Sequence, residues 1–576
     1  MVSESHTHVL KGGIKMSAGE VICAALPGQH NLMDYHEAYR NYDQSAFDRQ
    51  FDWYSTGRLN IVHEAVDRHV ATGRGGAVAL YYRDNERQET YSFAGLQRQS
   101  CRLARVLQKY GVRCGDRVAI FLPRSPEWYI AFLGAARLGA ILVPCFEALM
   151  SDALQVRLAG SRARLLVTNR ELLTRVPWSN LPALKNVLLV DDGARQPGEL
   201  SWRSEMAQAD DGLLIKWLDN EHPLFILYVA GADGQARGVV HAHEMMRGLL
   251  PTALWVHDLK PGDVYWCTAD PGWITGIAYG FLAPWLLGIP TVVRGGRFSG
   301  PDWAKTLADY RVSVWYSAPT AFRMLQQCGD LLKDYDLSNL RHILSVGEKL
   351  TDDVQEWVIN TFGFPVYDTW WMSETGMNMI CQLRCLPVKK GAMGVPLPGV
   401  QAAVVDDEGN PLPPRRVGHL ALRRGWPAMF RGIWEDNAAY QRYFSRPPWF
   451  ISGDAAYCDD DGYFYFQGRV DGVINTAGER VSPWEVERKL EEHPAVQRAG
   501  VAGKPDPLRG EIVKAYIELA PGYSWSEELA AALRDLVKFG LAAHAAPREL
   551  EPIAAVPLQK DGQVDRRALR TLVLEL

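Results

Sequence analysis

The sequence predicts an α/β protein, with a large N-terminal domain of mostly parallel sheets flanked by helices and a small α+β C-terminal domain. Three observations support this prediction. The 576-residue chain is longer than a single hydrophobic core usually serves. Short apolar segments alternate with segments of helical spacing, which is typical of parallel sheets covered by helices on both faces. The last part of the chain begins a new pattern after a charged, glycine-containing joint.

The alternation of strands and helices is clearest in the first half of the chain. Residues 92–111 have the apolar spacing of a helix and end on a glycine, residues 117–123 form a short apolar strand, and residues 125–140 return to helical spacing. The strand pattern recurs in ILVPC, RLLVT, NVLLV and FILYV. Sheets of this kind bind ligands at the carboxyl ends of their strands, so we expect the site in the loops that follow them.

The C-terminal part of the chain predicts a domain of its own. Residues 459–474 indicate a hairpin followed by the charged joint. Beyond it come the helix SPWEVERKLEEH, the strands VQRAGVAG and EIVKAYIEL, a second helix and a basic tail. We therefore predict a loosely ordered tail over residues 1–35, an N-terminal domain over residues 36–470 and a C-terminal domain over residues 471–576.

The composition argues against several classes of protein. A formal net charge of −5 disfavours a nucleic-acid-binding protein, because such proteins need an excess of Lys and Arg. Nine cysteines without paired spacing suit reduced thiols in the cytoplasm better than disulfides or a zinc site. The most apolar stretch, residues 277–293, is interrupted by Gly and Pro, so we expect it to be buried in protein rather than in a membrane.

A glycine-rich stretch, YVAGADGQARGVVHAH, follows the strand FILYV. Its glycines, Gly231, Gly234 and Gly238, allow tight turns and a close approach of the backbone to an anion, and Arg237 adds a positive charge. A glycine-rich turn is a weak signal by itself, because many such turns are only structural. Whether this glycine-rich stretch is functional therefore depends on the other motifs of the chain.

These motifs occur in the order GDRVAIFLPRSPEW, DVYWCTADPGWITGIAYG, SAPTAFRML, SVGEKL, YDTWWMSETG and SGDAAYCDDDGYFYFQGRVDGVINTAGERVSPWEVE. Together with the glycine-rich stretch they resemble the acyl-adenylate-forming superfamily, and within it the short bacterial-type acetyl-CoA synthetases. The resemblance runs from Tyr42 to the C-terminus. It implies that the C-terminal domain is a mobile lid. It also implies a two-step reaction with ATP, Mg²⁺, a small carboxylate and CoA, which passes through an acyl-adenylate and releases AMP and pyrophosphate.

The resemblance also implies roles for individual residues. The nucleotide-binding positions are Gly231, Gly234, Arg237, Gly238, Gly347, Glu348, Lys349, Asp368, Thr369, Trp370 and Asp454, of which Asp454 would hold the ribose. The catalytic positions are Ser373 at the α-phosphate, Glu374 as the Mg²⁺ ligand, Arg469 and Arg480 near ribose and phosphate, and Lys560. Asp471 matches the hinge, and Gly478 matches the CoA channel.

The acyl pocket predicted by the resemblance is small. Its wall falls on Trp273, Ile274, Thr275, Val346 and Trp371. A Trp side chain at position 371 leaves room for two or three carbons, so acetate is the expected substrate and propionate the second choice. A pocket discriminates one methylene by only about 1–3 kcal/mol, so some turnover of propionate is expected.

Two segments depart from the family pattern. The hydroxyl residues usual in the glycine-rich loop are replaced by Val229, Ala230, Ala232 and Asp233, and the usual lysine is Arg237. The C-terminal segment LQKDGQVDRR has Gln563 where relatives have a lysine, which leaves Lys560 as the nearest substitute. Both segments serve the adenylation step.

Three functions follow from this pattern. The first is an AMP-forming acetate–CoA ligase in which adenylation is impaired. The second is an enzyme limited to the thioester-forming half reaction. The third is a non-catalytic homologue that binds AMP or acyl-CoA and acts as a sensor or a protein partner. All three share one fold, so the fold does not distinguish them.

Overall fold

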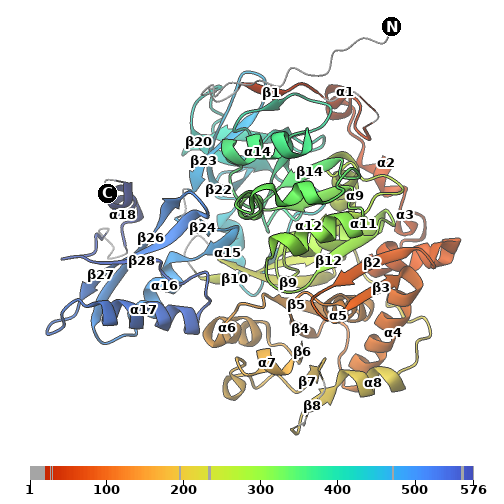
Figure 1. Cartoon of the computed structure of the whole chain (residues 1–576). Helices are drawn as coiled ribbons and strands as arrows, with labels where there is room; N and C mark the ends of the chain where they lie inside the picture. Colours follow the sequence, from red (N-terminus) through yellow and green to blue (C-terminus); the bar gives the residue numbers. More distant parts are fainter. Residues whose placement is uncertain are drawn as a thin grey trace.

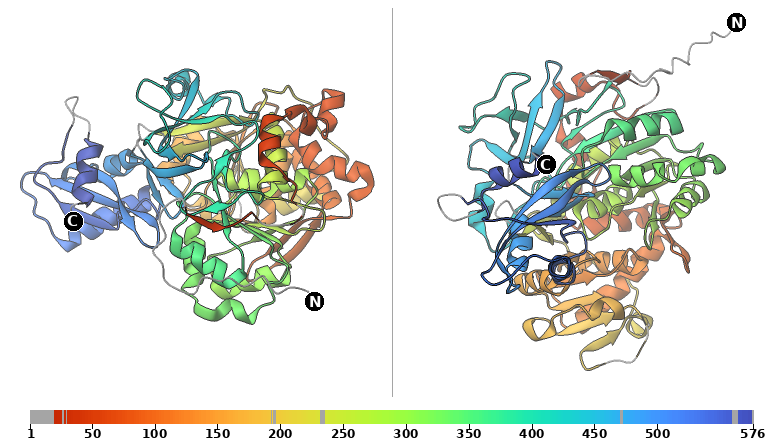
Figure 2. Two further views of the ribbon diagram at one scale, coloured as in Figure 1. Left: turned by 90° about the horizontal axis from the view of Figure 1, so that it is seen from above. Right: turned by 60° about the vertical axis from the view of Figure 1, so that its left-hand side comes forward.

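The computed structural model describes residues 20–25, 28, 30–191, 193, 196–230, 235–469, 472–558 and 564–574. The C-terminal strands and helices form a small body beside a much larger one (Figure 1). Figure 2 shows that this small body projects from one side of the molecule. The structure confirms the predicted fold class, with helices packed on large, mainly parallel sheets.

The first large sheet contains the predicted strands of the first half of the chain. Its eight strands have the order β21-β10-β9-β5-β4-β6-β7-β8. Their bounds are β4 (Arg117–Phe121), β5 (Ile141–Cys145), β6 (Leu165–Thr168), β7 (Asn186–Leu189), β8 (Glu199–Ser201), β9 (Pro223–Ala230), β10 (Ala236–Ala242) and β21 (Gly432–Ile433). Strands β4 to β9 pair in parallel, whereas β10 returns antiparallel to β9. The described residues of the glycine-rich stretch therefore lie mainly in two antiparallel strands, β9 and β10.

Helices accompany this sheet as the sequence predicts. They are α4 (Phe93–Lys109), α5 (Pro126–Arg137), α6 (Ser151–Ser161), α7 (Arg170–Leu173), α8 (Trp202–Gln208) and the 3-10 turn η3 (Trp178–Asn180). Helix α4 begins after Ser92, whose hydroxyl oxygen accepts a hydrogen bond from the Gly95 N–H at 3.1 Å. This cap satisfies one of the amide groups that a helix N-terminus leaves without an intrahelical partner.

The second large sheet has nine strands in the order β18-β16-β15-β14-β13-β11-β12-β2-β3. Their bounds are β2 (Val78–Arg83), β3 (Gln88–Ser92), β11 (Tyr265–Cys267), β12 (Thr291–Arg294), β13 (Val314–Ser317), β14 (His342–Ser345), β15 (Val366–Trp370), β16 (Ile380–Cys381) and β18 (Val395–Pro396). Six of these strands run parallel to one another: β2, β12, β11, β13, β14 and β15. Their carboxyl ends carry Ser317, Ser345 and Trp370, next to the predicted site.

Most helices of the N-terminal part are short. Their bounds are α1 (Tyr35–Arg40), α2 (Gln44–Asp48), α3 (Asp52–Thr56), η1 (His63–Asp67), η2 (Val70–Arg74), η4 (His243–Met245), α9 (Met246–Trp255), α10 (Ile274–Ile277), η5 (Ala278–Leu282), α11 (Ala283–Leu286), α12 (Gly300–Asp309), α13 (Pro319–Gln326), η6 (Gly329–Asp334), α14 (Asp352–Phe362) and α15 (Asn437–Arg442). Within the described residues, no helix is both long and apolar enough to cross a membrane.

Three smaller sheets complete the fold. An antiparallel sheet joins β19 (Ala402–Val405), β20 (Gly418–Arg423), β22 (Trp449–Cys458) and β23 (Phe464–Arg469). The C-terminal sheet joins β24 (Ile474–Thr476), β25 (Glu479–Val481), β26 (Val496–Asp506), β27 (Gly510–Leu519) and β28 (Glu549–Pro552), with helices α16 (Pro483–Leu490), α17 (Glu527–Gly540) and α18 (Arg566–Leu574). Strand β1 (Val21–Cys23) pairs with β17 (Val388–Lys389).

Strand β1 corrects the predicted tail. Residues 20–35 were expected to be loosely ordered, but β1 pairs with β17, and Leu32 is buried. The Asn31 side chain donates to the backbone oxygens of Leu254 and Leu259 at 3.0 and 2.9 Å. These hydrogen bonds join residues far apart in sequence, so local sequence patterns do not reveal them.

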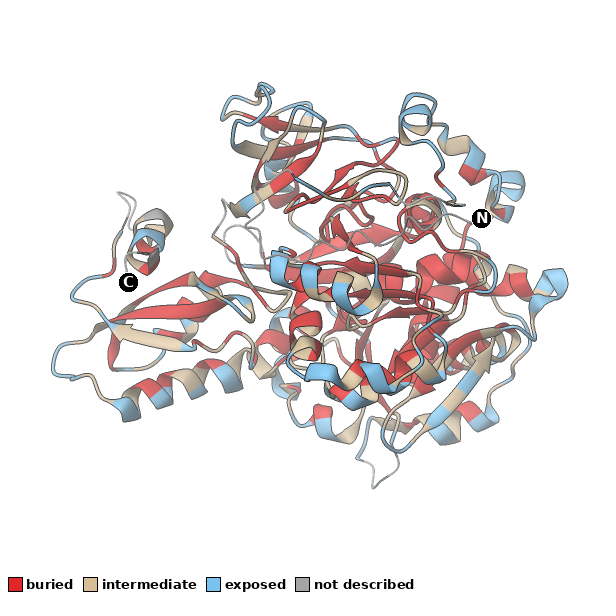
Figure 3. Cartoon of the chain, turned by 45° about the horizontal axis from the view of Figure 1, so that its top comes forward, coloured by how far each residue is buried: buried red, intermediate tan, exposed pale blue. Residues whose placement is uncertain are grey.

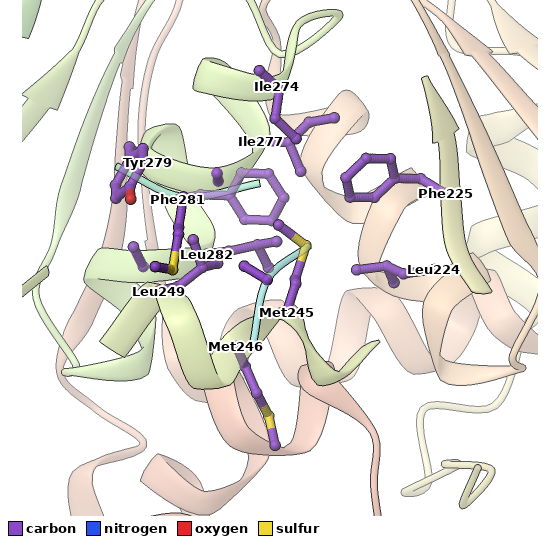
Figure 4. Packing of buried hydrophobic residues seen from close by; sticks show 14 of the residues in the cluster. Leu224, Phe225, Met245, Met246, Leu249, Ile274, Ile277, Tyr279, Phe281 and Leu282 are labelled. Carbon is purple, nitrogen blue, oxygen red and sulfur yellow. The ribbon is translucent and has the colours of Figure 1, made fainter. Parts of the chain in front are cut away.

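The hydrophobic core lies between the two large sheets. Its main cluster combines side chains from α4, α5, α9 and η5 with side chains from strands of both sheets. Buried residues concentrate in this interior (Figure 3). In Figure 4, Leu224 and Phe225 of β9 face Met245, Ile277 and Phe281. Residues 277–293, the most apolar stretch, are therefore buried in protein, as predicted.

Candidate nucleotide and acyl site

Most of the predicted site residues line one cavity. Its lining includes Trp273, Ile274, Thr275, Val346, Gly347, Glu348, Lys349, Asp368, Thr369, Trp370, Trp371, Ser373, Asp454, Arg469, Gly478 and Arg480. These positions are spread over more than 200 residues of sequence. They meet because the strands of the second large sheet end beside the antiparallel sheet and the C-terminal sheet.

A second cavity adjoins the first and is rich in positive charge. It is lined by Arg237, Glu374, Arg442, Tyr443 and residues 451–453, and it shares Met372, Arg469 and Arg480 with the first cavity. Four arginines around one carboxylate favour the binding of a polyanion in this cavity, because guanidinium groups bind phosphate oxygens well. Arg237 also forms an ion pair with Asp436.

The carboxylate of Asp454 is held at the edge of the first cavity by two donors. The Trp370 indole N–H donates to Asp454 Oδ2 at 2.8 Å, and Arg469 Nη1 donates to Oδ1 at 2.9 Å. Asp454 and Arg469 face one another in the register of β22 and β23. A carboxylate only accepts hydrogen bonds and has about four acceptor sites, so it suits hydroxyl groups such as those of a ribose.

Asp368 lies deeper in the same cavity. Its Oδ1 accepts a hydrogen bond from the Ser345 hydroxyl at 2.6 Å, and burial raises the pKa of Asp368 to about 7. The neighbouring Thr369 hydroxyl donates to the backbone oxygen of Ser345 at 2.7 Å, so it points into the protein. Gly347 has a φ of 89°, a conformation that glycine adopts without strain.

Glu374 is fully buried at the wall of the second cavity. The Tyr443 hydroxyl donates to its Oε1 at 2.8 Å, and Arg480 Nη1 lies 3.6 Å from its Oε2. Oε2 accepts no hydrogen bond within the described part of the chain. No cluster of three or more His, Cys, Asp or Glu side chains suited to a metal occurs among the described residues. One free carboxylate oxygen fits Mg²⁺, which binds through few carboxylates plus substrate phosphates and water.

The wall predicted to enclose the acyl group is mostly apolar. Ile274, Val346 and Trp371 are buried there beside Trp273 and Thr275. The indole N–H of Trp371 donates to the Tyr316 hydroxyl at 3.0 Å. The wall is therefore made of large side chains with fixed neighbours.

The C-terminal domain closes the cavity through the hairpin of β24 and β25, which carries Gly478 and Arg480. The Asn475 side chain donates to the backbone oxygen of Gly347. Arg323 Nε donates to the backbone oxygen of Leu508 at 2.7 Å, and Arg323 also pairs with Glu348 at 2.6 Å. The carboxylate of Glu348 is therefore engaged by Arg323 where the N-terminal part meets the C-terminal domain.

Some predicted residues are not part of this geometry. Gly231, Ala232, Asp233, Gly234, Asp471, Lys560 and Gln563 lie outside the described residues. Gly238 lies in β10 and lines neither cavity; a Cβ atom there would lie 2.6 Å from Ile226 Cγ2 and 3.0 Å from the Trp434 Cβ. Close packing therefore explains this glycine.

Comparisons with known proteins match this architecture. A family model described as AMP-binding enzyme matches residues 67–434, and one described as AMP-binding enzyme C-terminal domain matches residues 485–563. The chain belongs to the AMP-binding enzyme family. Acetyl-coenzyme A synthetase of Bacillus subtilis is 49% identical to this AMP-binding enzyme over 96% of the chain and 97% of the relative. The acetyl-coenzyme A synthetase of Methanothrix thermoacetophila is 34% identical over 91% and 84%, respectively.

A solved structure shares the fold of this AMP-binding enzyme. The crystal structure of an acyl-CoA synthetase from Brucella canis matches with a TM-score of 0.71 and 30% sequence identity, over 94% of this chain and 99% of the other. The family assignment suggested by the motifs is therefore confirmed.

Several residues of the site were missed from the sequence. Arg442 and Tyr443 reach the second cavity from the end of α15, and Asn475 reaches the first from the lid. Their nearest signal is position, because each lies within about 35 residues of Asp454. Tertiary packing brings Arg442 and Tyr443 to Glu374, and no local sequence motif predicts this contact.

Proposed function

We propose that this protein is an AMP-forming acetate–CoA ligase. It converts acetate, ATP and CoA into acetyl-CoA, AMP and pyrophosphate through an acetyl-adenylate. The observation that carries the proposal is the single cavity in which the acyl wall around Trp371 adjoins the nucleotide end around Asp454. The 49% identity to a protein named acetyl-coenzyme A synthetase, over 96% of the chain, supports acetate as the substrate.

In the first step, the acetate carboxylate attacks the α-phosphorus of ATP, and pyrophosphate leaves. Asp454 would hold the ribose, and Ser373 would contact the α-phosphate. Arg237, Arg469 and Arg480 line the region where negative charge accumulates, and fixed positive charge in a partly buried site stabilises it strongly. Mg²⁺ bound at Glu374 would supply Lewis-acid neutralisation of the phosphate oxygens.

In the second step, the thiol sulfur of CoA attacks the acyl carbon of the adenylate, and AMP leaves. We infer that residues 471–576 act as a lid for this step, because the lid hairpin brings Gly478 next to the acyl wall. A glycine there keeps space for a slender substituent such as the pantetheine arm. The docked lid also excludes water from the thioester-forming site.

We place the enzyme in the cytoplasm. All nine cysteines lie within the described residues as free thiols, and four of them are buried. Unpaired thiols are typical of a reducing compartment.

The test is release of pyrophosphate by the purified protein with acetate, ATP, Mg²⁺ and CoA, compared with reactions that lack acetate. We expect acetate-dependent release together with equal amounts of acetyl-CoA. Absence of acetate-dependent release overturns the proposal. Supplied acetyl-adenylate plus CoA would then show whether the second step remains on its own.

The substituted phosphate loop makes a further prediction about rate. If the loop binds phosphate as the family resemblance implies, Asp233 would add a negative charge beside the outer phosphates of ATP, and Gln563 stands where relatives have a cation. We expect the double variant Asp233→Thr/Gln563→Lys to release pyrophosphate faster than the natural protein. Equal rates would show that these substitutions do not limit adenylation.

A further inference from the structure

A fully buried hydrogen-bond network lies behind the acyl wall. Its central member is Tyr316 of β13, whose side chain is inaccessible to solvent. The Trp371 indole N–H points at the Tyr316 oxygen from 3.0 Å. Thr369 Oγ1 lies 2.7 Å from the same oxygen, and Asn378 Nδ2 lies 3.4 Å from it.

The directions of these hydrogen bonds follow from the chemistry of each group. A phenol donates one hydrogen bond and accepts two. Trp371 and Asn378 are both donors to Tyr316, so they fill its two acceptor positions. The Tyr316 hydroxyl must then donate to Thr369 Oγ1, whose own hydrogen goes to the backbone oxygen of Ser345 at 2.7 Å. The Tyr316 hydroxyl therefore has no donor or acceptor position left for a further hydrogen bond.

The far side of the network fixes the orientation of Asn378. Burial lowers the pKa of His257 to about 3, so its ring is neutral. His257 Nε2 lies 3.0 Å from Asn378 Oδ1, and the Tyr265 hydroxyl lies 3.2 Å from His257 Nδ1. With Asn378 Oδ1 as the acceptor, the neutral ring donates through Nε2–H and accepts the Tyr265 hydroxyl hydrogen at Nδ1. The Asn378 amide must then turn its NH₂ group toward Tyr316.

The ring of Trp371 is also held by an aromatic neighbour. Tyr279 packs against it edge to face, with ring centroids 5.0 Å apart and planes at 90°. The Tyr279 ring is fixed in turn, because its hydroxyl donates to Thr252 Oγ1 at 2.9 Å and accepts from the Asn378 N–H at 2.8 Å. An aromatic contact restrains the plane of the indole, but a hydrogen bond to its single N–H selects one rotation of the ring.

We propose that Tyr316 is a positioning residue for acyl-chain selection: it holds the Trp371 indole across the end of the acyl pocket by accepting its N–H. The inference rests on the proposed acetate–CoA ligase function. Selectivity for a two-carbon acid requires that the side chains of the pocket wall keep their positions when a longer acid binds. Without the Tyr316 oxygen, the indole loses its directional bond and can rotate away from an added methylene.

The test compares Tyr316→Phe with the natural enzyme. Initial rates with acetate and with propionate give kcat/KM for each acid. We expect the ratio of kcat/KM for propionate to kcat/KM for acetate to rise by about 10-fold. A change of this size is within the discrimination that a pocket achieves for one methylene. Most of the change should appear as a higher KM for acetate and a lower KM for propionate, because the variant alters ground-state fit as well as the transition state.

The matched control is Tyr265→Phe. This change also deletes a buried tyrosine hydroxyl from the network, but two residues, His257 and Asn378, separate it from Tyr316. A general loss of stability would affect both variants alike. We expect only Tyr316→Phe to change the acid preference. An unchanged ratio in Tyr316→Phe, or an equal change in both variants, overturns the inference.

A second comparison covers the case in which Tyr316→Phe does not fold. In a Trp371→Phe background no indole N–H remains to be left unpaired, so Tyr316→Phe should be better tolerated. Trp371→Phe and Trp371→Phe/Tyr316→Phe should then share one propionate-to-acetate ratio, because Tyr316 acts through the indole. Different ratios overturn the inference. A natural enzyme without acetate-dependent turnover overturns the proposed function itself, and the inference falls with it.

Discussion

The β24–β25 hairpin of the proposed lid places the carboxyl group of Glu479 against the N-terminal domain, and this contact predicts pH-dependent docking. Burial, followed by the charge of Asp270, raises the pKa of Glu479 on the lid hairpin to about 8. Burial also raises the pKa of Asp270 to about 7, with Glu147 adding to the effect and Arg124 opposing it. Glu348 adds a further negative charge near Glu479.

The sign follows from proton uptake. In an undocked lid Glu479 would face water with its ordinary pKa of 4.5, so between pH 4.5 and about 8 docking takes up a proton. Docking is therefore strongest at acid pH, weakens as the pH rises through this window and levels off above it. A tenfold change in proton affinity corresponds to about 1.4 kcal/mol, so the free energy of docking weakens by on the order of 4 kcal/mol across the whole window.

Hydrogen exchange of residues 474–481 measures this docking. The matched variant is Glu479→Gln, which keeps the shape of the side chain and cannot ionise. At each pH the ratio of exchange rates between the two proteins cancels the intrinsic pH dependence of exchange. We expect the natural lid to lose protection relative to the variant, on the order of 100-fold or more, between pH 5.5 and pH 8.5. Parallel profiles in the two proteins would refute the reasoning.

Three other predictions concern the site and the core. Glu374→Gln should lower kcat/KM by about 100-fold or more and weaken the Mg²⁺ dependence of the rate, measured by Mg²⁺ titration; an unchanged Mg²⁺ profile would count against the metal assignment. Asp454→Asn should raise the KM for ATP by about 10–100-fold and leave the KM for acetate nearly unchanged, because Arg469 loses its buried partner at the nucleotide end; equal changes for both substrates would contradict this. Arg137→Met should reduce the free energy of unfolding by about 3–5 kcal/mol in denaturant titrations, since it leaves the buried carboxylate of Asp67 with the hydrogen bond from Gln97 but no ion pair; a change below about 1 kcal/mol would show that this carboxylate needs no charged partner.

The fold could be predicted from the sequence where periodicity alone determines structure. Strands β4 to β7 and helices α4 and α5 lie where short apolar runs and helical spacing place them. The hairpin of β9 and β10 was less accessible, because the glycine-rich turn suits several connections between strand and helix. The pairing of β1 with β17 depends on residues more than 350 positions apart, and no local pattern encodes it.

The site was predictable where side-chain chemistry is confined to a short motif. Ser373, Asp454 and Trp371 reached one cavity from motifs that were recognisable one at a time. Tyr443 was not predictable, because its hydroxyl meets Glu374 only after α15 packs beside that residue. Gly238 of β10 packs closely against Ile226, so its packing alone accounts for a glycine at this position, and its nucleotide role stays a prediction.

The saturated network behind Trp371 also constrains how acid preference could change over evolutionary time. Replacing the indole by a small residue removes one donor and leaves the Tyr316 oxygen with an unfilled acceptor in the protein interior. A lineage that adopts longer acids therefore gains pocket volume and an unpaired buried group in the same step. A change that begins at Tyr316 instead leaves the indole N–H unpaired and frees the ring, so propionate is accepted while acetate still binds, with a higher KM. Acid preference in this scaffold is thus expected to shift through intermediates that accept both acetate and propionate.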